Sequence, residues 1–472
     1  MILIIFANVF KGGTLVSNST NSATTSSESN LKRVLGFKEV LSIAMGQTIG
    51  SGIMAMMGTA IGMTGRGVVL AFILSSIFVV FMGIPTMMMG SALPTTGGAY
   101  RYASRLGHPI AGLFYIIIYL SYNITLALFA ISFADYMQSI IPGMPFKLCA
   151  VGILTLMFVA NLFGMGWAAK LQNIMVLVMI VAFAVFIVNG VPQVDFSQFA
   201  SKQAIMPNGF LTMITTAGLL TFATGGANVI ASLGGEMKNP GRDIPLCMAL
   251  GTLLVGIVYA LMSVVAAGVL PIEQVANQNL SIVAREIMSY PLFVFFISCG
   301  ALIAIATTLN STMGWVTKPV LVACQDGWFP KGLAVVNKKY GTPHILLSIF
   351  YVIGLIPILL DISLASLSTL GSGISLFMAM VPMCSCFFLY KKYPDAVANA
   401  PFKLKPGLAK VATAFALILC AIQSLLLFST LSATGIMISM GYAAAALVVS
   451  VIVYRIKKPV LYTGDAKKDF GM

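Results

Sequence analysis

The stretch GQTIGSGIM, residues 46–54, interrupts an apolar segment that extends over residues 38–63. Its three glycines, together with Thr48 and Ser51, make it a poor helix former. If the segment crosses a membrane, the interruption lies near mid-depth. Irregular backbone is tolerated there only when it is buried in protein or lines a cavity, because each freed N–H and C=O group needs a partner. The stretch is therefore a candidate binding site.

The composition places the whole chain in a membrane. Of its 472 residues, 59% are hydrophobic and 8% are charged, whereas soluble domains carry roughly 25% charged residues. Apolar segments of about 20 residues, the length that crosses a bilayer as a helix, recur along the chain. We predict an all-α integral membrane protein with twelve transmembrane helices, at about 38–63, 68–92, 109–137, 146–164, 169–191, 209–234, 245–270, 291–323, 343–360, 364–390, 409–430 and 434–455.

The positive charges predict the orientation of these helices. With both termini in the cytoplasm, 23 of the 27 Lys and Arg residues fall on the cytoplasmic side and 4 on the other, as the positive-inside rule requires. The net charge of +14 thus reflects topology, and no nucleic-acid partner is expected. We expect one membrane domain over 35–456 in the plasma membrane, a disordered N-terminal tail over 1–34 and a cytoplasmic C-terminal tail over 457–472.

The scarcity of buried charge argues against an enzyme. Among the 13 acidic residues only Asp135 can be called membrane-embedded, and the two histidines, His108 and His344, sit at helix starts. Acid–base or metal chemistry needs such groups gathered at one depth. The seven cysteines lie in or beside apolar segments without metal-ligand company. We therefore expect no enzymatic activity, no metal and no cofactor.

A second interruption lies in the sixth predicted helix, within the stretch LLTFATGGANVIASLGG. Helices one to five and six to ten form two sets, each of which begins with an interrupted helix. Because five is odd, the second set enters the membrane from the opposite side. This arrangement is typical of inverted repeats, whose interrupted helices form a binding site at the midplane.

We expect repeat one over about 38–191, repeat two over about 209–390, and two further helices over about 409–455. Either interruption taken alone is equally compatible with close helix packing through small residues. The corresponding positions of the two interruptions favour the binding site.

Five motifs resemble those of the amino acid-polyamine-organocation superfamily of transporters. Their order and spacing agree with that superfamily over about residues 35–455. They are GQTIGSGIM, ALPTTGGAYRYASRLG (92–107), FATGGAN with GGEMKNPGRDIP (within 222–245), QDGWFPKGLAVVNKKYGTP (325–343) and APFKLKPG (400–407). The resemblance implies a LeuT-like fold, a five-plus-five inverted repeat with discontinuous helices 1 and 6, plus two extra C-terminal helices. The sixth helix is most similar to that of the L-type amino acid transporters, whose pattern reads Phe-Ala-Tyr-Gly-Gly-Trp-Asn.

Departures from the family patterns leave the substrate and the coupling ion open. Thr224 and Ala227 replace the two larger aromatic residues of the L-type pattern, so we expect selectivity to depend on them. Some relatives carry a lysine in the fifth helix that replaces a sodium ion, and this chain has Met179 there. A coupling ion, H⁺ or Na⁺, is therefore neither required nor excluded. The hydroxyl groups of Thr308, Ser311 and Thr312 could bind a cation. Equally, they could only form hydrogen bonds to the backbone of their own helix.

The two interruptions can bind an amino acid without any charged side chain. Freed N–H groups at the start of the outer half of helix 1 lie at the positive end of a helix dipole and suit a carboxylate. Freed carbonyls in helix 6 suit the ammonium group. The resemblance adds Phe222 as an external gate. The expected substrate-binding residues are Thr48, Ile49, Gly50, Ser51, Gly52, Thr221, Phe222, Ala223, Thr224, Gly225, Ala227 and Asn228.

We therefore predict a secondary transporter of neutral, zwitterionic amino acids that works by alternating access in the lipid bilayer. Exchange, uniport and ion-coupled symport all remain open, as does the oligomeric state. The alternatives are a transporter-like amino acid sensor or binding subunit without net transport, and a carrier of amino-acid-derived amines. A channel is less well supported, since no ring of charged residues marks a pore.

Overall fold

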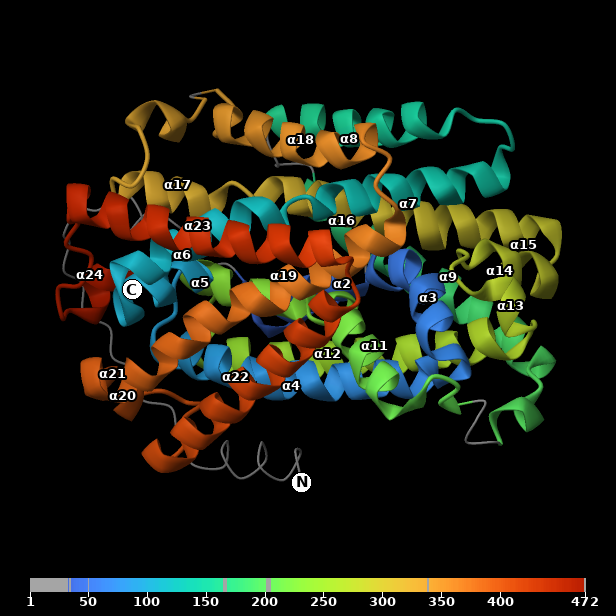
Figure 1. Ribbon diagram of the computed structural model, residues 1–472, viewed down its shortest axis with the longest axis horizontal. Coiled ribbons are helices and arrows are strands. Elements are labelled where there is room, and N and C mark those ends of the chain that lie inside the picture. The colour runs from blue at the N-terminus through green and yellow to red at the C-terminus, as the bar shows by residue number, and fades with distance from the viewer. Residues whose placement is uncertain are drawn as a thin grey trace.

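The computed structural model describes residues 33, 35–49, 51–163, 168–200, 205–337 and 339–470, with backbone alone for residues 51, 168–176 and 331. Within these ranges the protein is all-helical, as predicted, and contains no β-strand. The long helices run roughly along the horizontal axis of Figure 1. They form one bundle.

Helices occupy each of the twelve predicted ranges. In chain order they are α2 (Phe37–Ile49), α3 (Ser51–Thr64), α4 (Val68–Ala92), α6 (Pro109–Tyr122), α7 (Thr125–Ile140), α8 (Phe146–Leu162), α9 (Ala168–Gly190), α11 (Gly209–Thr224), η5 (Gly226–Glu236), α12 (Pro240–Gly268), α15 (Tyr290–Phe295), η6 (Phe296–Leu302), α16 (Ile303–Trp315), α17 (Lys318–Gln325), α18 (His344–Leu359), α19 (Leu364–Ser385), α22 (Pro406–Ser429) and α23 (Ala433–Lys457). The connecting elements are η1 (Gly65–Gly67), α5 (Gly98–Arg101), η2 (Tyr102–Gly107), η3 (Val191–Gln193), η4 (Phe196–Phe199), α13 (Ile272–Val275), α14 (Ser281–Ile287), η7 (Lys331–Ala334), η8 (Cys386–Phe388), α20 (Leu389–Lys392), α21 (Pro394–Ala398) and α24 (Ala466–Phe470).

Eight helical stretches in the described part of the chain are long and apolar enough to cross a membrane, and three further apolar helices are shorter. The protein is therefore a multi-pass membrane protein. One of the eight stretches joins α3 to α4 through η1, so the number of stretches is not the number of crossings. The predicted count of twelve spans remains a prediction.

Local sequence explains where several helices begin. His108 precedes Pro109, the first residue of α6, and its ring nitrogen Nδ1 accepts a hydrogen bond from the N–H of Ile110. Serine hydroxyls cap α19 and α23 in the same way, from Ser363 and Ser432. An oxygen or nitrogen acceptor before the first turn accepts a hydrogen bond from an N–H group that has no partner within the helix. A proline in the first turn has no N–H group that would need a partner.

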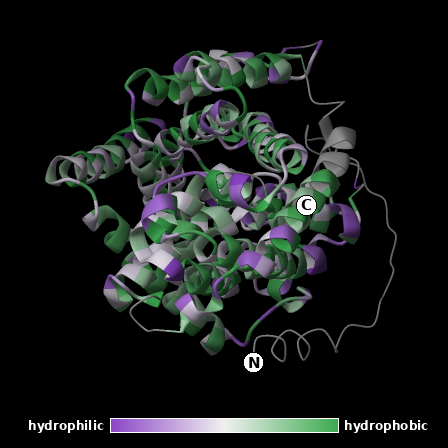
Figure 2. Cartoon of the chain, turned by 90° about the vertical axis from the view of Figure 1, so that its right-hand side faces the viewer, coloured by the Kyte–Doolittle hydropathy of each residue, from purple (hydrophilic) through white to green (hydrophobic). Residues whose placement is uncertain are grey.

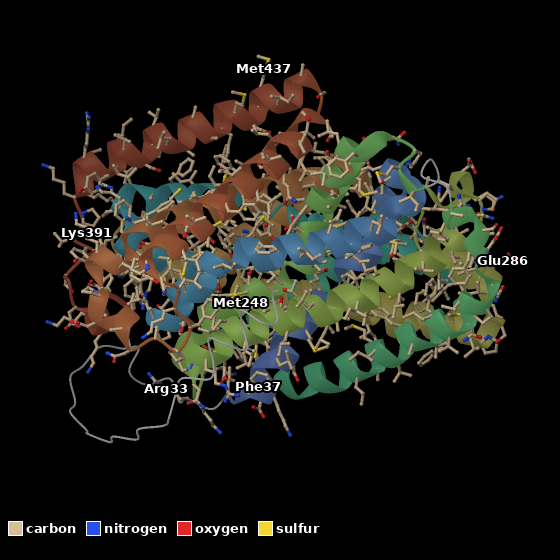
Figure 3. The ribbon with its side chains drawn as sticks, turned by 90° about the horizontal axis from the view of Figure 1, so that it is seen from below. Arg33, Phe37, Met248, Glu286, Lys391 and Met437 are labelled. Atoms are coloured by element: carbon tan, nitrogen blue, oxygen red, sulfur yellow. The ribbon has the colours of Figure 1, made fainter. Side chains whose placement is uncertain are left out.

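The surface of the bundle is apolar around its circumference and charged at its ends. In Figure 2 the helices at the top, α8 and α18, carry mostly hydrophobic residues. Leu148 on α8 is 70% exposed, as expected for a side chain that faces lipid. Lys391 lies at one end of the bundle and Glu286 at the other (Figure 3). We call the end with Lys391 the α24 end and the end with Glu286 the α14 end, after the elements that lie there in Figure 1.

The helices of the first two and the sixth and seventh predicted spans pack together. Helix α12 packs against α4 and α2, and α11 packs against α4 and α3. This packing brings the two interrupted spans, α2 with α3 and α11 with η5, into direct contact. The position of the candidate site follows from it.

The segment after α23 folds back onto the α24 end. Its last described residue, Phe470, is fully buried, with its ring centroid 6.0 Å from that of Tyr102 and 5.5 Å from that of Tyr393. The carboxylate of Asp469 is 2% exposed and accepts hydrogen bonds from the hydroxyl of Tyr393 at 2.6 Å and the backbone N–H of Thr463 at 3.0 Å. Burial first, and the Asp469 carboxylate second, raise the pKa of Tyr393, so its hydroxyl remains the donor. The sequence analysis did not foresee this docked segment.

Replacing Asp469 by alanine should release the segment. The change removes a buried acceptor and leaves its donors unpaired, which costs about 1–3 kcal/mol, so cleavage by trypsin after Lys467 or Lys468 should accelerate roughly tenfold or more. Asp395→Ala is the control, because Asp395 is exposed on α21 at the same end of the protein. Equal cleavage rates for the two variants would contradict the docking.

Candidate functional site

The two interruptions touch backbone to backbone. A Cβ atom added to Gly52, in the first turn of α3, would lie 2.5 Å from the Cα of Ala223 in the last turn of α11. One added to Gly226, at the start of η5, would lie 2.6 Å from the carbonyl oxygen of Gln47 in α2. Real Cβ atoms do not approach other atoms so closely, so both positions require glycine. The GQTIGSGIM and FATGGAN motifs therefore form one crossing.

A cavity of about 280 Å³ lies at this crossing. Helices α4, α6, α7, α16 and α19 contribute further walls. The lining residues from the two interruptions are Gln47, Thr48, Gly52, Thr221, Phe222, Ala223, Gly225, Gly226 and Asn228. Most of the predicted substrate-binding residues are thus brought together around one space.

Three of the predicted substrate-binding residues do not line this cavity. Ile49 is 1% exposed and belongs to the hydrophobic core. The hydroxyl of Thr224 lies 2.8 Å from that of Ser75 on α4, and Ala227 is 1% exposed in the core beside α12. Successive residues at a helix end point in different directions, so neighbours of lining residues face the helix packing instead. Gly50 and the side chain of Ser51 lie outside the described residues.

The four positions considered for an ion are divided. Thr308 and Thr312 on α16 line the cavity, whereas Ser311 and Met179 do not. Met179 on α9 is fully buried in the hydrophobic core. The hydroxyl of Thr308 donates to the carbonyl of Ala304, one turn earlier in its own helix, at 3.0 Å.

A tyrosine that the sequence analysis missed supports the first interruption. The hydroxyl of Tyr259 on α12 donates to the carbonyl of Thr48 at 2.5 Å, and its ring packs edge-on against Phe72 at 5.5 Å. Tyr259 thus ties the last turn of α2 to α12. A tyrosine within an apolar span is the available sequence signal, but its partner is a backbone atom 211 residues away.

Aromatic side chains cover the cavity on one side. The ring of Phe222 lies 6.1 Å, centroid to centroid, from the rings of Tyr122 and Phe129. Tyr119 and Trp315 line the cavity nearby, and the hydroxyl of Tyr119 donates to the carbonyl of Val316 at 3.0 Å. Phe222 therefore sits where the cavity meets an aromatic cluster built from α6 and α7.

The protein is tightly packed between the crossing and the α14 end. The hydroxyl of Tyr136 on α7 donates to the carbonyl of Met54 on α3 at 3.3 Å and accepts the N–H of Leu280 at 3.1 Å. A Cβ atom added to Gly58 would lie 1.9 Å from the carbonyl oxygen of Gln278, so the loop before α14 rests directly on α3. These contacts join α3, α7 and the loop.

The cavity extends toward the opposite, α24 end. Its lining there includes Thr96, Gly97, Ser232 and Lys318, which come from the segments next to α5 and from η5 and α17. Lys318 is exposed, and it is the single charged residue among the described residues that line the cavity. The cavity is therefore reached from the α24 end.

Comparison with known proteins connects this arrangement to transport. A family model described as amino acid permease matches residues 35–452. The chain is 26% identical to the branched-chain amino acid permease BcaP of Bacillus subtilis (strain 168), over 79% of this chain and 84% of that protein. It is 24% identical to the methylthioribose transporter of the same organism, over 67% of this chain and 73% of that protein.

The solved structures include a protein of the same fold. The structure is similar to that of a mutant of the Eremococcus coleocola manganese transporter, with a TM-score of 0.57, and the match covers 91% of this chain and 97% of that chain. The sequence identity is 13%, so this similarity concerns the fold alone.

Substituting alanine for Gly226 should separate the two interruptions. The added Cβ cannot be accommodated at 2.6 Å from Gln47 O without moving backbone, and such overpacking typically costs about 1–3 kcal/mol. We expect a lower thermal unfolding temperature and loss of substrate binding. Gly152→Ala on α8, where a Cβ meets nothing within 4 Å, is the control and should leave both unchanged or raise stability. Identical behaviour of the two variants would refute the crossing.

Tyr259→Phe should weaken the site without creating a large cavity. The change removes the hydrogen bond that the buried carbonyl of Thr48 accepts from α12, at a cost of about 0.5–1.5 kcal/mol. Tyr442→Phe serves as control, because Tyr442 makes a similar bond to the carbonyl of Ile117 on the exposed surface. Thermal unfolding and substrate affinity measured on both proteins test this role, which fails if Tyr442→Phe is the more damaging change.

Proposed function

Because the chain belongs to the amino acid permease family, we propose that it is a secondary transporter that carries amino acids with uncharged side chains by alternating access. The amino acid-polyamine-organocation superfamily indicated by the motifs is thereby confirmed. The observation that carries the finer proposal is the cavity where α2 and α3 meet α11 and η5. Each of its parts can be assigned a role.

Backbone groups bind the part of the substrate that all amino acids share. In this proposal α3 is the outer half of an interrupted helix, so the N–H groups of its first turn, including that of Gly52, lie at the positive end of its dipole. They bind the carboxylate. The carbonyls near the end of α11, from Thr221 to Gly225, accept the ammonium group. Support comes from the contact of Gly52 with Ala223, two residues that line the same cavity.

The side chain of the substrate is uncharged in this proposal. Lys318, the charged residue of the described lining, sits at the exposed mouth, so a charged side chain deep in the cavity would have no counter-charge. Burying an unpaired charge is strongly unfavourable.

We propose twelve spans in a LeuT-like arrangement, over residues 35–456, in the plasma membrane. Both termini are cytoplasmic, because the Lys- and Arg-rich loops share that side. Repeat one begins with α2 and α3 and repeat two with α11 and η5. The α24 end is then the cytoplasmic end, and the conformation described is open to the cytoplasm. Phe222 closes the cavity on the other side, as an external gate.

Flux of labelled amino acids in proteoliposomes tests the proposal. We expect uptake of labelled leucine and alanine, and competition by other neutral amino acids but not by lysine. Uptake only with amino acid inside the vesicles means exchange, and uptake into empty vesicles means uniport or, if a proton or sodium gradient is required, symport. Binding without flux would overturn the transporter assignment and favour a sensor.

Phe222→Ala should impair transport more than binding. Removing the ring opens the cavity beside Tyr122 and Phe129, so the site can no longer be closed on that side. We expect the transport rate to fall more than roughly tenfold, equivalent to about 1.4 kcal/mol on the conformational step, with affinity changed less. Phe163→Ala, at an exposed phenylalanine after α8, should match the wild type. An unchanged rate for Phe222→Ala would remove the gate from the proposal.

A further inference from the structure

Three sulfur atoms from distant parts of the chain meet at one wall of the cavity. The Sγ of Cys420 on α22 lies 3.1 Å from the Sδ of Met82 on α4 and 4.0 Å from the Sδ of Met383 on α19. All three residues line the cavity, yet each is at most 5% exposed. We call the lining formed by Val79, Met82, Leu376, Ala379, Met383 and Cys420 the sulfur wall.

The sulfur wall adjoins the second interruption. Gly83, the neighbour of Met82, lies so close to η5 that a Cβ atom added to it would be 3.9 Å from the Oδ1 of Asn228. On the other side, the hydroxyl of Ser372 on α19 donates to the carbonyl of Leu219 on α11 at 2.8 Å. Helices α4 and α19 are thus held against α11 and η5. The sulfur wall and the carbonyls proposed for the ammonium group line the same cavity.

The chemistry of this wall is that of an adaptable apolar surface. None of its six residues is charged or carries a hydroxyl or amide group. Methionine is unbranched and polarisable, so it adjusts to apolar groups of different shape. A charged substrate side chain at this wall would have no counter-charge, whereas each methylene group bound there is removed from contact with water, which favours binding.

We propose that the sulfur wall binds the side chain of the substrate and makes the protein selective for amino acids with large aliphatic or thioether side chains. The inference rests on the proposed function, since it assumes an amino acid held at the crossing. Burial of one methylene favours binding by about fourfold. Leucine and methionine should therefore bind more tightly than alanine by roughly tenfold or more.

A larger side chain in the sulfur wall, which narrows the cavity beside it, tests the inference. Ala379→Leu places three more carbons in the cavity, and it should lower the affinity for leucine and methionine at least roughly tenfold while leaving that for alanine within about threefold. Ala365→Leu, at an exposed position of the same helix, should change none of them. An equal loss for alanine and leucine, or no loss for either, overturns the sulfur wall as the side-chain site. Absence of uptake of every amino acid by the wild-type protein overturns the proposed function instead.

Discussion

The contact of two backbones at the crossing is the constraint on which the rest of the structure depends. Gly52 lies against Ala223, and Gly226 lies against Gln47, at distances that leave no space for a Cβ atom. Two helices can approach so closely only where the facing residues are small. The same approach places the GQTIGSGIM and FATGGAN motifs beside one cavity. The close packing is observed, and the binding site proposed here uses the same residues.

A site built from backbone has to be stabilised from outside. The carbonyl of Thr48, in the last turn of α2, receives the hydroxyl of Tyr259 from α12. Thr224 does not face the cavity but meets Ser75 on α4. Each of these bonds joins an interrupted helix to an unbroken one, so α4 and α12 hold the ends of the interrupted helices in place. Such fixed dipoles can bind a zwitterion without introducing a buried charged side chain.

The sequence predicted the elements of this protein better than it predicted the directions of its side chains. Apolar length located helices in all twelve ranges, and the glycine-rich stretch FATGGAN located the change from α11 to η5 at Gly225. The predicted interruption of the first helix centres on Gly50, which lies outside the described residues. Residue spacing alone could not tell that Ala223 faces the cavity and Thr224 the packing, because adjacent positions at a helix end differ by about 100° in direction. Tyr259 and the sulfur wall were missed for a related reason. Their partners are a backbone atom or side chains on helices far away in the chain.

What the sequence determined by itself was the membrane class and the family, since these follow from composition and from motif order. Tertiary structure decided which residues of the interruptions line the cavity, which helices support them, and where the segment that ends in Phe470 docks. The physical reason is that hydropathy and backbone propensity are local properties of the chain. The direction of a side chain and the partner of a buried polar group depend on which helices pack against one another.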